Sequence, residues 1–237
     1  MTDEEMQMRT KLDTQFDEQL NTLENLNWFP WIGQDFSASK PNLLVVGESL
    51  YNYDNDAEIA AGDRQFARFF IYDHVFEDTN ANQKLIRNTE LAVFNSYPSE
   101  EQKKIFWANS GYYYFVHKFL KDGRNERPNN EDFSNGWDTF MKVVLILKPE
   151  YCLFCGVTSS TYHAAFEMAL KENNFQASTI EWKEKYGRVQ SRVSSIEHAN
   201  GYKVKLLFMK HPSSYFSWDK WANFLGKEAE EVTSRYR

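Results

Sequence analysis

The chain has 237 residues, of which 42% are apolar and 26% charged, a composition typical of a folded globular protein rather than a disordered one. No apolar run approaches the roughly 20 residues that cross a bilayer, and the N-terminus lacks the basic-then-apolar pattern of a signal peptide, so we expect a cytoplasmic protein with no membrane partner. The formal net charge of −7 argues against non-specific binding of nucleic acid over the whole surface, although it leaves room for a local basic groove.

The first third of the chain contains predicted helices and one strongly apolar strand. Leucines and a phenylalanine recur at helical spacing within residues 3–25, which predicts an amphipathic helix. Residues 42–47 form a continuous apolar run that ends in a glycine, as expected for a parallel strand buried on both faces. Helices are then predicted over residues 64–76 and 82–94.

The remaining two thirds alternate predicted strands with predicted helices. Further strands are predicted at residues 105–108, 150–156 and 202–209, and further helices at 132–147, 164–170 and 218–233. Residues 175–196 alternate apolar and polar side chains and are predicted as a hairpin or an excursion from the main sheet. This succession of strand, helix and strand implies right-handed parallel crossovers in an α/β fold.

Two short motifs place polar residues directly after predicted core strands. Gly47-Glu48-Ser49-Leu50-Tyr51 follows the first strand, and His211-Pro212-Ser213 follows the last. Because ligands of open α/β sheets bind at the carboxyl ends of the strands, one crevice is expected to hold both motifs. A carboxylate there can position or deprotonate a water, and an imidazole can hydrogen-bond an anion that forms as a bond breaks. The pair predicts a hydrolytic site.

These motifs resemble those of the uracil-DNA glycosylase superfamily. Gly47-Glu48-Ser49-Leu50-Tyr51 resembles the first motif of that family, residues 148–156 are similar to its third strand ending in glycine, and His211-Pro212-Ser213 resembles its second motif. All three occur in the family's order, within roughly residues 42 to 225. The resemblance implies a DNA repair hydrolase that flips a base out of the DNA and cleaves its N-glycosidic bond.

With this resemblance, the pattern of elements predicts one domain over residues 1–237. We expect a three-layer αβα sandwich around a central, mostly parallel four-stranded sheet of order 2-1-3-4, over residues 42–235. Residues 1–40 are expected to form an N-terminal helical appendage.

The resemblance also assigns roles to individual residues. Glu48 would position the attacking water or stabilise the sugar cation, and His211 would stabilise the departing base. Tyr51 would close one wall of the base pocket, Asn109 would read the Watson–Crick edge of the base, and Ser213 would contact a backbone phosphate.

Other residues would complete the base pocket and the DNA contact. A flipped base needs an aromatic wall to stack on, and a wedge must fill the gap left in the DNA. The pocket is expected to include Gly47, Ser49, Phe66 and Phe70. The DNA contact is expected to involve Lys210, Ser214, Tyr215 and Phe216.

No cofactor or metal is expected. Cys152 and Cys155 lie on opposite faces of one predicted strand, so they are predicted to be core residues rather than a metal clip. The histidines show no ligand spacing with cysteines or carboxylates.

Two alternatives use the same residues differently. Gly47-Glu48-Ser49-Leu50 differs by one acid from the Gly-Asp-Ser-Leu motif of esterases, with Ser49 as nucleophile, but Phe208 occupies the place of the aspartate expected three residues before the histidine. The other alternative is a non-catalytic binding module for nucleic acid or protein. The acidic loop over residues 51–63 and the net charge favour a protein or small ligand as its partner, and they leave the base open for a glycosylase.

Overall fold

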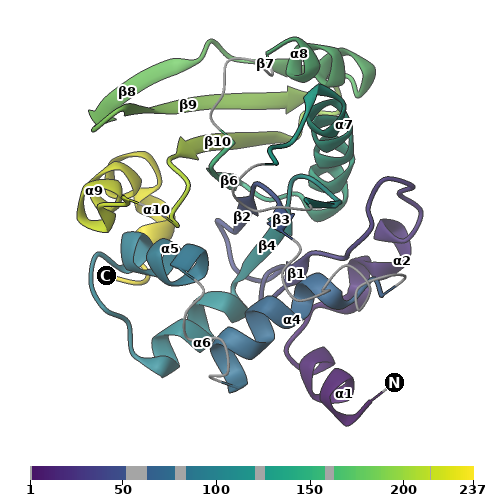
Figure 1. Ribbon diagram of the computed structural model, residues 1–237, viewed down its shortest axis with the longest axis vertical. Coiled ribbons are helices and arrows are strands. Elements are labelled where there is room, and N and C mark those ends of the chain that lie inside the picture. Colours follow the sequence, from purple (N-terminus) through teal and green to yellow (C-terminus); the bar gives the residue numbers. More distant parts are fainter. Residues whose placement is uncertain (1, 52–62, 78–83, 121–125, 158–162, 214) are drawn as a thin grey trace.

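The protein is described here from a computed structural model that covers residues 2–51, 63–77, 84–120, 126–157, 163–213 and 215–237. Its centre is an eight-stranded mixed sheet of order β1-β4-β2-β6-β10-β9-β7, with β8 paired to β9 (Figure 1). The strands are β1 Trp31–Ile32, β2 Leu43–Gly47, β4 Ser110–Tyr114, β6 Tyr151–Cys155, β7 Phe175–Ala177, β8 Glu181–Tyr186, β9 Val189–His198 and β10 Lys203–Met209. A separate two-stranded parallel sheet joins β3 (Leu50–Tyr51) to β5 (Phe119–Leu120).

The prediction of a central, mostly parallel four-stranded sheet is wrong. In the part of the chain that the structure describes, four of the seven strand pairings in the main sheet are antiparallel. The parallel pairings join β4 to β2, β2 to β6 and β6 to β10. The predicted excursion over residues 175–196 instead supplies β7, β8 and β9, which continue the main sheet beyond β10. Strand pairing is non-local, so the local apolar pattern did not reveal how many strands share one sheet.

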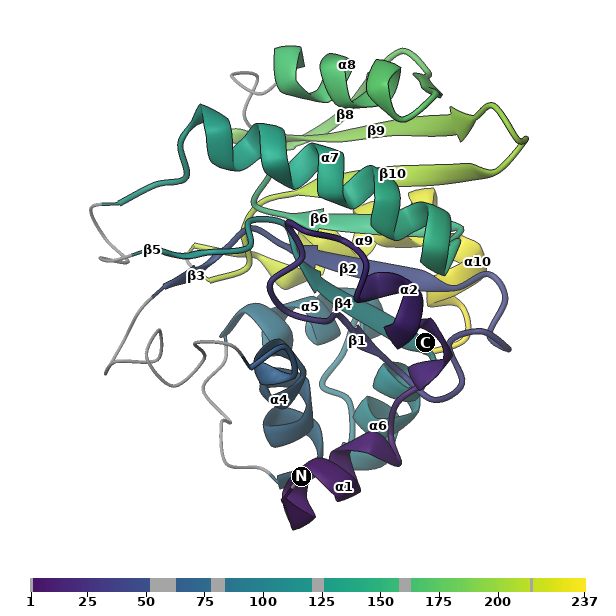
Figure 2. The same cartoon turned by 90° about the vertical axis from the view of Figure 1, so that its right-hand side faces the viewer.

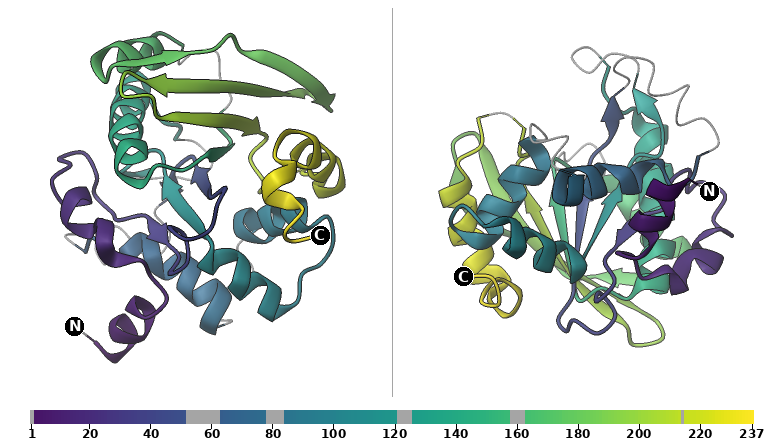
Figure 3. Two further views of the ribbon diagram at one scale, coloured as in Figure 1. Left: turned by 180° about the vertical axis from the view of Figure 1, so that it is seen from behind. Right: turned by 90° about the horizontal axis from the view of Figure 1, so that it is seen from below.

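Helices cover both faces of this sheet (Figure 2). One face packs against α2 (Asp17–Leu20), α7 (Asn130–Leu147) and α8 (His163–Glu172). The opposite face packs against α4 (Phe66–Tyr72), α5 (Lys84–Phe94), α6 (Glu100–Ala108), α9 (Trp218–Glu228) and α10 (Glu230–Thr233). The remaining helical segments are α1 (Asp3–Arg9), the 3-10 turn η1 (Thr14–Phe16) and the π-helical turn η2 (Asp73–Glu77), which continues α4. Figure 3 shows the same layers from behind and from below.

The predicted strand over residues 105–108 is also wrong, because these residues end helix α6. A capping box between Ser99 and Gln102 starts this helix. Phe106 and Trp107 are buried in the core, whereas Ile105 is 48% exposed. Four apolar residues in a row fit a buried strand and a helix end equally well, so periodicity did not separate them. The predicted helix over residues 3–25 is likewise divided into α1, η1 and α2.

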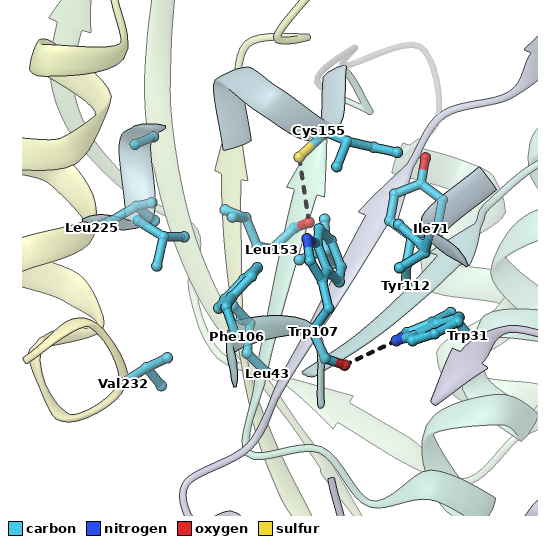
Figure 4. Packing of buried hydrophobic residues seen from close by; sticks show 14 of the residues in the cluster. Trp31, Leu43, Ile71, Phe106, Trp107, Tyr112, Leu153, Cys155, Leu225 and Val232 are labelled. Carbon is cyan, nitrogen blue, oxygen red and sulfur yellow. Dashed lines mark hydrogen bonds between the residues drawn. The ribbon is translucent and has the colours of Figure 1, made fainter. Parts of the chain in front are cut away.

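The sheet separates two hydrophobic clusters. In β2, Leu43 and Val45 face one cluster, and Leu44 and Val46 face the other. Figure 4 shows the first cluster, where the Trp31 Nε1 donates to the Trp107 carbonyl oxygen at 2.9 Å. The thiols of β6 are also divided: Cys155 lies in the first cluster and Cys152 in the second. Both are buried and free, which confirms that they are core residues.

Candidate active site at the carboxyl ends of the parallel strands

Strands β2, β6 and β10 end side by side. Gly47 pairs with Cys155, and Cys155 pairs with Met209, so the last residues of the three strands are in register. The next residues in each chain segment therefore lie at one edge of the sheet, with Glu48 after β2, Gly156 after β6 and His211 two residues after β10. β3 extends from this same edge (Figure 2). The fold brings the two predicted catalytic residues to opposite sides of Gly156.

Glu48 is a buried acid that pairs with a cation. The residue is 4% exposed, and its Oε2 lies 3.1 Å from Nη2 of Arg127. Burial raises the pKa of Glu48, and the nearby Arg127 opposes this shift. Arg127 also donates from Nη1 to the hydroxyl of Tyr51 at 3.0 Å, so it joins the predicted acid to the predicted pocket wall. Because the side chain of Arg127 is 66% exposed, the Glu48–Arg127 ion pair lies at the boundary between the protein interior and the solvent.

His211 is held in one tautomer. Its Nδ1 accepts the backbone N–H of Ser213 at 3.2 Å and lies 2.8 Å from Ser213 Oγ. A nitrogen that accepts an N–H carries no proton, so the neutral ring holds its proton on Nε2. Burial, and to a smaller extent Arg127, lowers the pKa of His211 to about 4. The ring is therefore neutral near pH 7 and presents one N–H donor from Nε2.

Two neighbours set the position of the His211 ring. Gly156 has a φ of +101°, and a Cβ at this residue would lie 2.7 Å from His211 Cδ2. Glycine therefore provides both the backbone conformation and the space for the imidazole. On the other side, the Asn88 side chain of α5 donates to the Pro212 carbonyl oxygen, which ties the turn after His211 to a core helix.

Aromatic residues line the sheet edge next to Glu48. A Cβ at Gly47 would lie 2.4 Å from the Tyr112 hydroxyl and 3.6 Å from a ring carbon of Tyr114, so glycine lets the tyrosines approach the end of β2. Tyr114 contacts Phe70 edge to face at 6.0 Å between ring centroids, and Phe70 contacts Phe66 at 5.4 Å. Phe66 and Phe70 are half-buried, which is compatible with one wall of a ligand site.

The structure does not bring Asn109 to this edge. Asn109 is the residue that ends α6, immediately before β4 begins, so it lies at the amino end of that strand. Its side chain donates to the Ile105 carbonyl oxygen at 2.7 Å. The misplacement follows directly from assigning residues 105–108 to a strand. The polar residue after the carboxyl end of β4 is His117, whose ring packs against Trp28 and Tyr113 and whose pKa burial lowers to about 3.

The segment after His211 contains one fully exposed aromatic ring. Tyr215 is 98% exposed and has a φ of +49°. Lys210 donates to the Tyr215 carbonyl oxygen at 2.9 Å, and its Nζ lies 5.7 Å from the centre of the Tyr215 ring. Phe216 is instead half-buried and stacks on Trp221 at 6.0 Å, so it belongs to the core packing. Ser214, which was predicted to contact DNA, lies outside the described residues.

Ser49 has no catalytic partner among the residues that the structure describes. Its Oγ is buried and forms no hydrogen bond there, and the hydroxyl beside His211 belongs to Ser213. The esterase hypothesis therefore gains no support from the geometry. Within the same described ranges, no group of three or more His, Cys, Asp or Glu residues is arranged to hold a metal ion. None of the described helices is long and apolar enough to cross a membrane.

Comparison with models of known protein families gave no match, and comparison with curated protein sequences gave none either. The site is therefore interpreted from its own geometry and from the motif resemblance.

Sequence reasoning missed Arg127. It occurs in a stretch rich in Gly, Asn, Arg and Pro, which indicates only a loop. No local pattern distinguishes an arginine that pairs with an acid 79 positions earlier from one that is solvated. The nearest signal is that Glu48 follows a buried strand, because a buried acid needs a donor or a cation.

Proposed function

We propose that the protein is a hydrolase of the DNA glycosylase type, which cleaves the N-glycosidic bond of a flipped base. The observation that carries this proposal is the placement of Glu48 and His211 at the carboxyl ends of β2 and β10, on either side of β6. Arg127 pairs with Glu48, and Gly156 at the end of β6 leaves the space that the His211 ring occupies.

Glu48, His211 and Arg127 each have a specific role in the proposed reaction. Glu48, as a carboxylate beside Arg127, positions the attacking water or stabilises positive charge that develops on the sugar. The Nε2–H of His211 donates to the base as negative charge develops on it, and a neutral imidazole makes this donation without giving up its proton. Arg127 favours the ionised form of Glu48 against the effect of burial, and its side chain is exposed enough to contact a phosphate.

The neighbouring segments support a nucleic-acid substrate. Phe66, Phe70 and Tyr51 offer rings beside Glu48, and Tyr215 offers an exposed ring beyond His211. Lys210 places a cation below Tyr215. Base stacking on aromatic rings next to cationic side chains is the usual way in which proteins hold unpaired nucleotides.

Base release from oligonucleotides tests the proposal. Purified protein is incubated with single- and double-stranded oligonucleotides that carry uracil or a damaged or modified base, and the free base is quantified. We expect Glu48→Gln to lower the rate by about 100- to 10,000-fold and His211→Asn by about 100- to 1,000-fold. Glu100→Gln, in an exposed helix turn, is the matched control and should keep the wild-type rate.

Two results would contradict the proposal. Salt-sensitive DNA binding without base release from any substrate would favour the non-catalytic binding module. Base release that is unchanged in both Glu48→Gln and His211→Asn would place the chemistry elsewhere.

A further inference from the structure

A row of stacked side chains crosses strands β6, β10, β9 and β8 of the main sheet. Phe154 of β6 stacks on Phe208 of β10 at 4.8 Å between ring centroids, with an interplanar angle of 17°. The Arg192 guanidinium of β9 lies 4.9 Å from the centre of the Phe208 ring, and it also lies 5.4 Å from the centre of the Trp182 ring on β8. The row follows from strand register, because each of these residues pairs with the next across the sheet.

This row runs from the core to the surface. Phe154 and Phe208 lie in the cluster under α7 and α8, Arg192 is 8% exposed, and Trp182 is 58% exposed. β8 lies at the outer edge of this end of the sheet, which it shares with β7 (Figure 1). The protein therefore keeps a large aromatic ring at its surface and places a buried cation directly beneath it.

Arg192 has a buried charge and few partners. Among the described residues it has no carboxylate within ion-pair distance, and its guanidinium donates one hydrogen bond, from Nη2 to the Val157 carbonyl oxygen at 3.4 Å. A guanidinium has five N–H donors, and within the described ranges only this one bond uses them, which leaves donors for an anion. Burial lowers the pKa of Arg192, as expected where no acid offsets the loss of water. Planar guanidinium groups held between aromatic rings suit bidentate binding of a phosphate.

The local charge favours an anionic ligand. The hairpin over residues 181–192 contains four basic and two acidic residues, although the whole chain carries a net charge of −7. Val157 follows Gly156 at the same sheet edge as Glu48 and His211. Because neighbouring strands are about 4.8 Å apart, Trp182 on β8 lies about 10 Å from β10, which is within the reach of one or two nucleotides.

From this arrangement we propose that Arg192 and Trp182 form a second subsite for single-stranded nucleic acid. Arg192 binds a backbone phosphate, and a neighbouring base stacks on the exposed part of the Trp182 ring. The subsite rests on the proposed function, because it would hold nucleotides that flank the one in the Glu48 and His211 site. It adds a contact surface that the two motifs do not predict.

Binding of a labelled single-stranded oligonucleotide of about twelve nucleotides, followed by fluorescence anisotropy over a series of salt concentrations, tests this subsite. We expect Trp182→Ala to weaken binding by about 5- to 100-fold, and Trp182→Phe to restore most of it. Arg192→Gln should also reduce the slope of log affinity against log salt by about 0.7, which is the contribution of one phosphate contact on a single strand. Ile105→Ala is the control, since this apolar, half-exposed residue lies on α6, which packs against the other face of the sheet.

The outcomes separate this subsite from the glycosylase chemistry. Equal affinity and equal salt slope in wild type, Trp182→Ala and Arg192→Gln would overturn the subsite, even if the protein releases bases. Loss of affinity in Trp182→Ala with no base release by wild type would support the subsite and count against the proposed function. Trp182 is at the surface, so its variants remain informative if Arg192→Gln, checked by urea unfolding, is not stably folded.

Discussion

Two buried glutamates, Glu48 and Glu90, differ in what surrounds them. Glu90 of α5 is fully buried, accepts the Trp107 Nε1–H at 2.8 Å and lies 3.2 Å from His74 Nε2, so its partners are core side chains. Glu48 lies at a strand end, and its ion-pair partner Arg127 is mostly exposed.

The comparison shows that burial alone does not identify a functional acid. A carboxylate whose donors all belong to the core is committed to the fold, since any exchange of partner would leave those donors unsatisfied. A carboxylate whose cation is open to solvent can exchange that cation for water or a ligand at low cost. The following predictions test this distinction, from the largest expected effect to the smallest.

The largest expected effect is the difference between the Glu90 and Glu48 variants in the free energy of unfolding. Glu90→Ala leaves Trp107 and His74 with unsatisfied buried groups, so we expect a loss of about 3–5 kcal/mol in the free energy of unfolding. Glu48→Ala should cost much less, because Arg127 can be hydrated. Urea unfolding of both variants, with Glu100→Ala as an exposed control, measures the difference. Equal losses for Glu48→Ala and Glu90→Ala would remove the basis of the comparison.

The second effect is on acid stability. The pKa of His211 is lowered from 6.5 to about 4, so between these values the unfolded chain binds a proton that the folded ring does not. The free energy of unfolding therefore falls as the pH drops from about 6.5 to 4, by up to about 3 kcal/mol from this residue. His211→Asn should remove that part of the pH dependence, whereas His163→Asn, at an exposed helix position, should not. Unfolding measured at several pH values checks this, and parallel curves for His211→Asn and wild type would contradict it.

Gly156→Ala should have an intermediate effect. The left-handed φ and the contact with His211 predict a loss of about 1–3 kcal/mol in stability and a displaced imidazole. Gly187→Ala is a matched control, because Gly187 also has a positive φ (+65°) but has no atom within 4 Å of a built Cβ. Base release should fall in Gly156→Ala alone. A similar fall in both variants would mean that backbone strain, rather than the position of His211, is responsible.

Arg127→Gln should have the smallest effect on stability, about 1 kcal/mol or less, because Arg127 is mostly exposed and Glu48, whose pKa burial raises, can take up a proton when its cation is lost. We expect the main effect of this substitution on the pH dependence of base release. Arg127 lowers the pKa of Glu48 against the effect of burial, so its removal raises that pKa and moves the acid limb of the base-release profile to higher pH. Arg9→Gln, at an exposed position in the last turn of α1, is the control. An unshifted acid limb would show that Arg127 does not set the ionisation of Glu48.

Several local features were readable in the sequence. The apolar run before Gly47 is β2, the runs at residues 150–156 and 202–209 are β6 and β10, and the predicted helix over residues 132–147 is α7. Each has a strong apolar pattern ended by glycine, proline or polar residues. The positions of Glu48 and His211 directly after two such strands placed them at one sheet edge.

Other features required the tertiary structure. The short apolar run over residues 105–108 fits a strand or a helix end, and its wrong assignment moved Asn109 to the wrong edge. The pairing of Arg127 with Glu48 spans 79 positions, and the stack of Arg192 on Phe208 depends on strand register.

The sequence by itself therefore determined where the core strands β2, β6 and β10 lie and which polar residues follow β2 and β10, because these depend on neighbouring residues. Only the tertiary structure decided that the main sheet has eight strands in the described part of the chain, that Arg127 pairs with Glu48, and that Trp182 and Arg192 stack on β8 and β9. Those features depend on hydrogen-bond pairing and side-chain contacts between distant segments, which leave no periodic signal in the chain.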